Sequence, residues 1–473
     1  MLSDTLRLAF GWMVPWLFGA SLMMASRSLR TKSQPGEVAW VVGCGWFIGA
    51  FALTLWMRLL SIAGVRFSIA SIAIPLAVAT IGLVAFAARR ESRAQWAETA
   101  REVWNEVRGA ELKGWKRALW LAIVVWLALR ALVLLSDVVT MPLYPWDAWI
   151  QWATKARVWF EMGRIVPFER GEAWFDAGGA AWLDAAPNYP ATVPLWQVWT
   201  NVTLGRWDDS LMNFPWWLLA VALMFVVYAT LRRAGCGALG ALVGAWLVSS
   251  LPLANVHVAL AGYADLPMAA YYALAAIAVW DWTRDRSFVN ALLACVLAVA
   301  CMTVKTPGIA WASTLVPAVV LTLFPRSGKR ILVAALVIAL AALVVLARTE
   351  AVVLGYRLHL DFAPPWFGML ESLFLLGNWH LLWYGALISA IVGWREVLSA
   401  KLATLSVTIA TGLLFLFVVF AFTNARTWVT DQTTVNRATL HLALLLSIWA
   451  LLVFDTWVRR LRNVAPAAIA TAA

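Results

Sequence analysis

Long apolar segments alternate with short charged connections from one end of the chain to the other. A helix of about 17–23 apolar residues is long enough to cross the hydrocarbon core of a bilayer. The pattern therefore predicts an all-α polytopic membrane protein with about 13 transmembrane helices, in the manner of a multi-pass bundle. The expected spans lie near residues 6–25, 38–58, 68–88, 118–138, 211–231, 238–256, 265–282, 288–304, 308–324, 331–349, 371–393, 402–422 and 438–457.

The cations follow this pattern, because clusters of Lys and Arg fill alternate connections. Short cytoplasmic loops are enriched in Lys and Arg, so the clusters mark the inner side. Thirteen spans put all seven clusters on that side, and one span more or fewer would break the alternation. The prediction is an N-terminus outside and a C-terminus in the cytoplasm.

The longest connection on the opposite side is residues 139–210, which are rich in carboxylates and tryptophan. It begins with YPWDAWIQWATKARVWF (144–160), which holds Asp147, Lys155 and four tryptophans. Such a composition favours helices lying in the membrane interface, with rings at the acyl boundary and charges toward the headgroups. An aromatic anchor without further function is the alternative reading of the same stretch.

An amphipathic connector at 89–117 divides the chain into modules. We expect three N-terminal spans plus the connector in residues 1–117, a module of ten spans in 118–457 that includes the outer loop 139–210, and a cytoplasmic tail in 458–473.

Composition narrows the class further. The chain of 473 residues is 63% hydrophobic and 13% charged, which excludes a soluble protein. The net charge of +12 lies mainly in the connections between spans, so it does not indicate binding to nucleic acid. The four cysteines show no metal-ligand spacing.

Four charged residues on the predicted outer side are candidates for chemistry. Asp147 lies beside two indole rings at a membrane exit, where a carboxylate is costly unless satisfied, and it fits a general base or a solvated loop residue. Asp265 starts a span two residues before a proline, so it fits a helix cap, a functional acid, or both. Lys305 and Arg437 stand at outer span boundaries and fit either binding of a lipid phosphate or snorkelling to the headgroups.

These motifs resemble those of integral-membrane glycosyltransferases of the GT-C superfamily. The similarity is to the RgtA/B/C/D-like branch, related to protein O-mannosyltransferases and the aminoarabinose transferase of lipid A. PWDAWIQWATKARVWF looks like the family's first outer loop, with Asp147 in its acidic position. The other similar stretches, over residues 118–457, are NYPATVPLWQVW with Asn188 where an acid is usual, GYADLPMAAYYALA with Asp265, MTVKTPG with Lys305 and TTVNRATLHLA with Arg437.

The resemblance implies a reaction on the extracytoplasmic side of a bacterial inner membrane. A sugar would pass, with inversion, from a polyprenyl-phosphate donor to a hydroxyl of a glycan, lipid or protein acceptor. Asp147 would be the base and Asp265 would orient the acceptor or support a divalent metal ion, with no other cofactor expected. The candidate substrate-binding residues are Lys305, Arg437, Lys155, Tyr189, Tyr263 and His257.

A polytopic transporter or lipid-linked sugar flippase is the main alternative. Such proteins also combine many spans with intramembrane charges, but they place the charges near the midplane and often contain repeats. Arg130, inside the fourth expected span, favours this alternative, whereas the outer clustering of the other charges favours the enzyme. A non-catalytic assembly partner is a third reading, which the unassigned residues 1–117 keep open.

Overall fold

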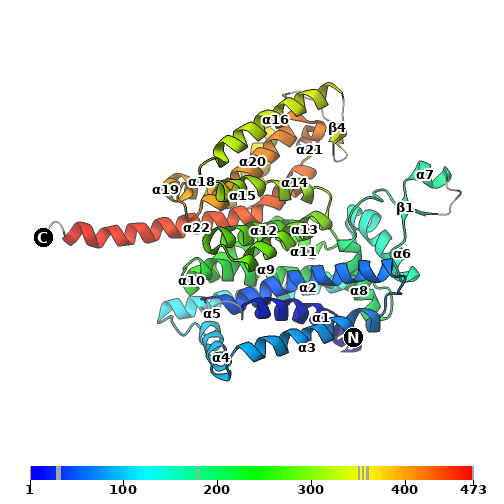
Figure 1. Cartoon of the computed structure of the whole chain (residues 1–473), viewed down its shortest axis with the longest axis horizontal. Helices are drawn as coiled ribbons and strands as arrows, with labels where there is room; N and C mark the ends of the chain where they lie inside the picture. Colours follow the sequence, from blue (N-terminus) through cyan, green and yellow to red (C-terminus); the bar gives the residue numbers. More distant parts are fainter. Residues whose placement is uncertain are drawn as a thin grey trace. The chain divides into compact units, whose positions relative to one another are not determined.

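The computed structural model describes residues 2–27, 34–176, 178, 181–349, 352–353, 356–357 and 362–470. This part of the chain is helical almost throughout, as predicted, with four strands of two residues each (Figure 1). The elements before residue 250 are α1 (Leu2–Arg27), α2 (Glu37–Ile62), α3 (Ile69–Arg90), α4 (Arg93–Val107), α5 (Trp115–Thr140), the π-helix η1 (Ala148–Ala153), α6 (Thr154–Met162), β1 (Phe168–Glu169), α7 (Gly171–Asp176), β2 (Trp182–Leu183), α8 (Thr192–Leu204), the 3₁₀-helix η2 (Leu211–Asn213), α9 (Phe214–Arg233) and α10 (Ala238–Ser249).

The remaining elements are mostly apolar helices of varied length. They are α11 (Pro252–Ala259), α12 (Asp265–Asp285), α13 (Phe288–Val304), α14 (Gly308–Ser313), α15 (Val316–Leu323), α16 (Gly328–Arg348), β3 (Val352–Val353), β4 (Tyr356–Arg357), α17 (Trp366–Leu370), the π-helix η3 (Glu371–Leu375), α18 (Leu382–Val392), α19 (Trp394–Val397), α20 (Ala403–Phe422), the 3₁₀-helix η4 (Asn424–Arg426), α21 (Thr427–Thr430) and α22 (Thr434–Ala470). The strands β1 and β2 pair in parallel, and β3 and β4 pair antiparallel. The tail expected from residue 458 continues α22 up to Ala470, and 471–473 lie outside the described residues.

The chain divides into two compact units. The first comprises Met1–Ser250 with Ala254–Pro267, and the second comprises Leu251–Leu253 with Met268–Ala473. The predicted acidic motifs and the whole of 139–210 belong to the first unit, whereas Lys305 and Arg437 belong to the second.

Helix ends in the first unit follow from local sequence. Ser68 caps α3 through reciprocal bonds with Ser71, in which each side chain accepts from the other's backbone N–H. Ser92 and Gln95 form the same box at the start of α4. Where α8 stops, Gly205 adopts a left-handed φ of 72°, which costs glycine little and lets the chain turn sharply.

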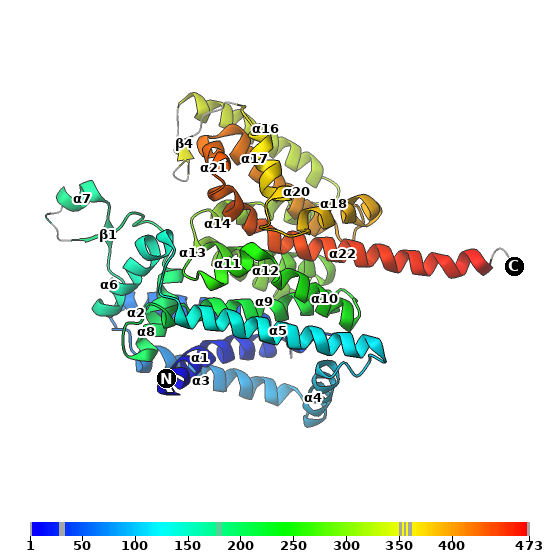
Figure 2. The ribbon, with the colours of Figure 1, turned by 180° about the vertical axis from the view of Figure 1, so that it is seen from behind.

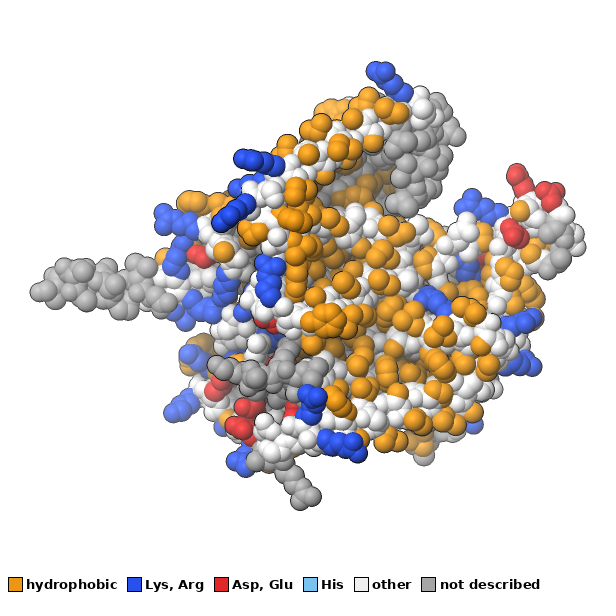
Figure 3. Space-filling model, in the orientation of Figure 1, with side chains coloured by type: hydrophobic (Ala, Val, Ile, Leu, Met, Phe, Trp, Pro, Cys, Tyr) orange, Lys and Arg blue, Asp and Glu red, His pale blue; other side chains and the backbone are white. Residues whose placement is uncertain are grey.

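Helices α1, α2, α3, α5 and α9 form the body of the first unit (Figures 1 and 2). Glycines allow α1 and α2 to touch backbone to backbone: a Cβ added at Gly19 would lie 1.9 Å from the Gly45 carbonyl oxygen, and one at Gly49 would lie 1.8 Å from that of Pro15. Small residues are favoured at such interfaces in membranes, where packing rather than the hydrophobic effect holds helices together. Apolar side chains cover the lengths of these helices, and charged side chains gather toward their ends (Figure 3).

A buried cluster of four tryptophans joins α8 to this body. The rings of Trp12, Trp46, Trp196 and Trp216 lie in successive contacts with centroids 5.5–6.4 Å apart. Trp12 Nε1 also donates a hydrogen bond of 3.0 Å to Thr200 Oγ1. Aromatic pairs at these separations stabilise beyond their buried area, and the buried N–H group has found its acceptor.

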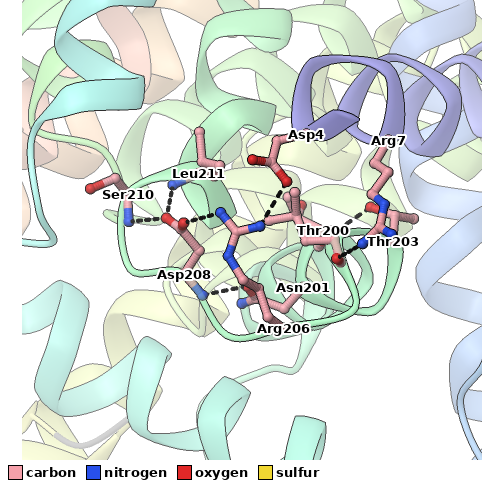
Figure 4. A network of polar contacts seen from close by, with 10 residues as sticks. Asp4, Arg7, Thr200, Asn201, Thr203, Arg206, Asp208, Ser210 and Leu211 are labelled. Atoms are coloured by element: carbon pink, nitrogen blue, oxygen red, sulfur yellow. Dashed lines mark hydrogen bonds and ion pairs between the residues drawn. The ribbon is translucent and has the colours of Figure 1, made fainter. Parts of the chain in front are cut away.

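A polar network ties the start of α1 to the end of α8 (Figure 4). Arg206 pairs with Asp4 at 2.7 Å and with Asp208 at 2.9 Å, and the Asp208 N–H donates to Asn201 Oδ1 at 2.9 Å. Arg7 donates to the backbone carbonyl of Leu204. The N-terminal module is thus the support for a helix of the large polar segment 139–210.

The core of the second unit centres on Trp311 of α14. Its ring contacts Tyr272, Phe415 and His441 with centroids 5.1, 5.2 and 5.7 Å away. The hydroxyls of Tyr272 and Thr314 share a hydrogen bond of 2.7 Å. These contacts join α12, α14, α20 and α22.

The number of membrane spans differs from the prediction. Helix occupies every expected span, yet seven described helices are long and apolar enough to cross a membrane, or eight if the bent pair α10 and α11 is one span. The expected spans 308–324 and 371–393 are each broken into shorter helices. Multi-pass membrane character is therefore confirmed, and the count of thirteen is not.

Candidate functional site

Asp147 lies where the chain enters the helical part of 139–210. It directly precedes η1 and is half-buried. The neighbouring rings of Trp146 and Trp149 meet edge to face with centroids 5.0 Å apart, and they are 66% and 44% exposed. The predicted helix at 144–160 is thus present as η1 followed by α6, and an exposed aromatic pair flanks its acid.

A close backbone contact brings this acid to the second acidic motif. Gly262 has a φ of 103°, and a Cβ added there would lie 2.7 Å from Ala148 Cβ and 2.8 Å from Leu143 Cδ1. Since both the conformation and the space exclude a side chain, the turn requires glycine. Asp147 precedes Ala148, and the fully buried Asp265 follows the turn as the first residue of α12.

Two further predicted residues flank the same turn. The rings of His257 and Tyr263 lie with centroids 5.3 Å apart, and Trp216 Nε1 donates a bond of 2.9 Å to the Tyr263 carbonyl oxygen. His257 is buried and Tyr263 is half-buried. The first unit therefore gathers Asp147, Asp265, His257 and Tyr263 around one turn, although they are spread over more than a hundred positions of the sequence.

Lys155 is not at the surface of this segment. Its side chain is 1% exposed and its Nζ lies 3.5 Å from Asp184 Oδ1, with the Asp184 side chain fully buried. Lys155 also donates to the backbone carbonyl of Ala186, whose N–H donates to Asp184 Oδ1 at 2.6 Å. The other carboxylate oxygen of Asp184 is buried and has no hydrogen-bond partner among the described residues.

Aromatic rings complete the setting of the pair. Trp152 and Tyr189 stack with centroids 5.2 Å apart, and Lys155 Nζ lies 5.9 and 6.0 Å from the two ring centres. Cations at such distances are attracted by the ring faces. Tyr189 and Lys155 thus hold α6 against the chain that enters α8, and substrate binding by either stays a prediction.

Burial dominates the electrostatics of this ion pair. It raises the pKa of the Asp184 carboxyl and lowers the pKa of the Lys155 ammonium, because both charged forms lose water. Each partner's charge works against the other's shift. The pair is therefore costly to form and more costly to break.

The predicted cations lie in the second unit. Lys305 directly follows α13, and Arg437 is in the first turn of α22; both are half-buried. The Trp311–His441 ring contact joins α14, which starts three residues after Lys305, to α22 one turn after Arg437. Their convergence on one phosphate, and their meeting with Asp147, stay predictions.

Sequence reasoning missed Asp184 as the partner of Lys155. The two are 29 positions apart in a segment with eight carboxylates, and no spacing rule selects that pair. The sequence predicts interfacial rings over 144–160, but the ring of Trp152 in this stretch is 1% exposed and stacks on Tyr189.

Within the described part of the chain, no group of three or more His, Cys, Asp or Glu side chains could hold a metal ion. Support of a divalent ion by Asp265 stays a prediction, and the chemistry below is argued from the chain's own residues.

These features define a multi-pass helical membrane protein with an acidic turn and a buried ion pair in its first unit. Comparison of the chain with protein-family models, curated proteins and solved structures finds no match.

Proposed function

We propose that the protein is a membrane glycosyltransferase that moves a hexosyl or pentosyl group from a polyprenyl-phosphate donor to an acceptor hydroxyl. The observation that carries the proposal is the contact of Ala148 with Gly262, which sets Asp147 beside the turn leading into Asp265. Two acids at the mouth of a membrane segment, one half-buried and one fully buried, suit a base with a supporting group. The motif resemblance supplies the reaction class.

The proposed chemistry is a single displacement. Asp147 accepts the proton of the acceptor hydroxyl while the oxygen of that hydroxyl attacks the anomeric carbon of the donor sugar. The bond from that carbon to the phosphate oxygen breaks, and its electron pair leaves with the polyprenyl phosphate, so the configuration inverts. Because phosphate is already a good leaving group, cations that stabilise its departing charge contribute more than a general acid would, and Lys305 and Arg437 take that role.

Binding of the donor tests the two cations. Replacing Lys305 or Arg437 by alanine should weaken donor binding by about 1.5–3 kcal/mol each, the range for hydrogen bonds to charged groups. Since both act on one phosphate, the double variant should show coupling rather than simple addition. Titration of the purified protein with a polyprenyl-phosphate sugar measures this. Additive losses below about 0.5 kcal/mol would identify two interfacial anchors.

One observation favours a transporter instead. Arg130 lies inside α5, and its Nε donates a bond of 3.3 Å to Asn255 Oδ1 on α11, while Asn255 Nδ2 donates to the Ser249 carbonyl at the end of α10. Helices α10 and α11 meet at a bend of 63°. Intramembrane cations beside broken helices are features of transporter sites.

Proteoliposomes distinguish the two functions. With a labelled polyprenyl-phosphate sugar and a mixture of cell-envelope acceptors, we expect free polyprenyl phosphate to accumulate together with a labelled product. An enzyme cleaves the donor, whereas a flippase moves it across the bilayer intact. Translocation of uncleaved donor, with no labelled product from any acceptor fraction, would support the transporter.

A further inference from the structure

A cavity of about 440 Å³ opens at one end of the first unit, where α2 begins and α9 ends. Its walls come from the start of α2, from α4 and from the end of α9, and they include Glu37, Glu102, Glu106, Glu111 and Arg232. Charged side chains gather at this end of the unit, beside α4 (Figure 3).

The cavity is acidic even after its internal pairing is counted. Arg232 Nε lies 2.9 Å from Glu106 Oε1, and its other end lies 3.4 Å from Glu111. The Tyr228 hydroxyl also donates to Glu106 at 2.7 Å. Among the described residues that line the cavity, four carboxylates stand with one guanidinium, a formal excess of three negative charges.

Glu37, in the wall of the cavity, has a carboxylate oxygen that needs a hydrogen-bond donor. It is the first residue of α2 and is 4% exposed, and its Oε2 is buried without a hydrogen-bond partner among the described residues. A buried carboxylate oxygen without a donor is costly. The favourable field of a helix N-terminus offsets part of that cost, but it does not supply the missing hydrogen bond.

We propose that this cavity binds the primary ammonium of an ethanolamine phospholipid headgroup. Glu37 and the end of α9 are the ends of two candidate spans, so the cavity lies at the depth of headgroups. A primary ammonium carries one positive charge and three N–H donors, enough for Glu37 and a neighbouring carboxylate. A choline headgroup has the same charge and no N–H, so it cannot satisfy the Glu37 oxygen. This lipid site is independent of the proposed glycosyl transfer.

The test compares the full chain in nanodiscs of phosphatidylethanolamine and of phosphatidylcholine with the same acyl chains. We expect the thermal midpoint to be about 3 °C or more higher in the ethanolamine lipid. Glu37→Gln keeps the shape and removes the charge, so it should abolish the difference between the two lipids. Glu98→Gln, at an exposed carboxylate of α4 outside the cavity, is the matched control and should retain it.

Three results would overturn the proposal. The first is a wild-type midpoint that is equal in the two lipids. The second is a Glu37→Gln variant that keeps the full difference. The third is an equal shift from soluble ethanolamine added to phosphatidylcholine discs, which would identify a free amine rather than a lipid headgroup as the ligand.

Discussion

Asp147→Asn should lower glycosyl transfer at least about 100-fold, because a positioned general base typically contributes 10²–10⁴-fold, or about 3–5 kcal/mol of barrier. Asparagine keeps the shape of the side chain and cannot accept the acceptor's proton. The contact of Ala148 with Gly262 involves neither carboxylate oxygen, so the turn should stay intact. Single-turnover rates and donor affinity, measured on the same preparation, separate the chemical step from binding.

The matched control for this variant is Asp176→Asn. Asp176 is an exposed acid at the end of α7 in the same polar segment, so its amide should leave the rate unchanged. A fall of less than tenfold for Asp147→Asn would make Asp147 an interfacial anchor. The transferase proposal would then lose its base but not its donor site.

Breaking the Lys155–Asp184 pair should cost about 3–5 kcal/mol of folding stability, because either single change leaves an uncompensated buried charge. Lys155→Met and Asp184→Leu are suitable single variants. The double variant should recover most of the loss, since well-packed apolar residues often replace a buried ion pair at little cost. Reversible denaturation in a mild detergent measures the three free energies.

The pH dependence of two single variants provides the control. In Lys155→Met the lone Asp184 has a raised pKa, so the folded state binds its proton more tightly, and stability should rise as pH falls through that pKa toward the ordinary 3.8. In Asp184→Asn the lone Lys155 has a lowered pKa, so stability should rise as pH increases through that pKa toward the ordinary 10.5. Slopes of the same sign in both variants would contradict a buried pair.

Hydrophobic periodicity predicted the helices well and their continuity poorly. Every expected span contains helix, because apolar length alone specifies it. The expected span 308–324 instead breaks between α14 and α15, just before Pro317, and 371–393 breaks near His380, whose φ is 48°. Breaks in a buried helix depend on side chains that satisfy the freed backbone groups, and those partners are distant in sequence.

The site was predictable as separate motifs only. The sequence alone singled out Asp147, because a carboxylate beside two indoles at a membrane exit is energetically costly unless it is satisfied. Its approach to Asp265 depends on Gly262, whose positive φ and close approach to Ala148 are set by the tertiary structure and cannot be read from the sequence. Substrate binding by Lys155 stays a prediction, but its buried pairing with Asp184, a carboxylate that no local pattern selects, could not be predicted from the sequence.

The bend between α10 and α11 has a consequence for biogenesis. Helix α10 has 12 residues, a rise of about 18 Å, which is shorter than the roughly 30 Å hydrocarbon core. It passes as a span only together with α11, so the insertion machinery would accept the two as one straight segment. At the break, the Asn255 side chain on α11 donates to the Ser249 carbonyl, and Arg130 donates in turn to Asn255 from α5, a helix that is synthesised earlier. We therefore expect the kink to form inside the membrane, after insertion, when the new segment meets a guanidinium that is already in place.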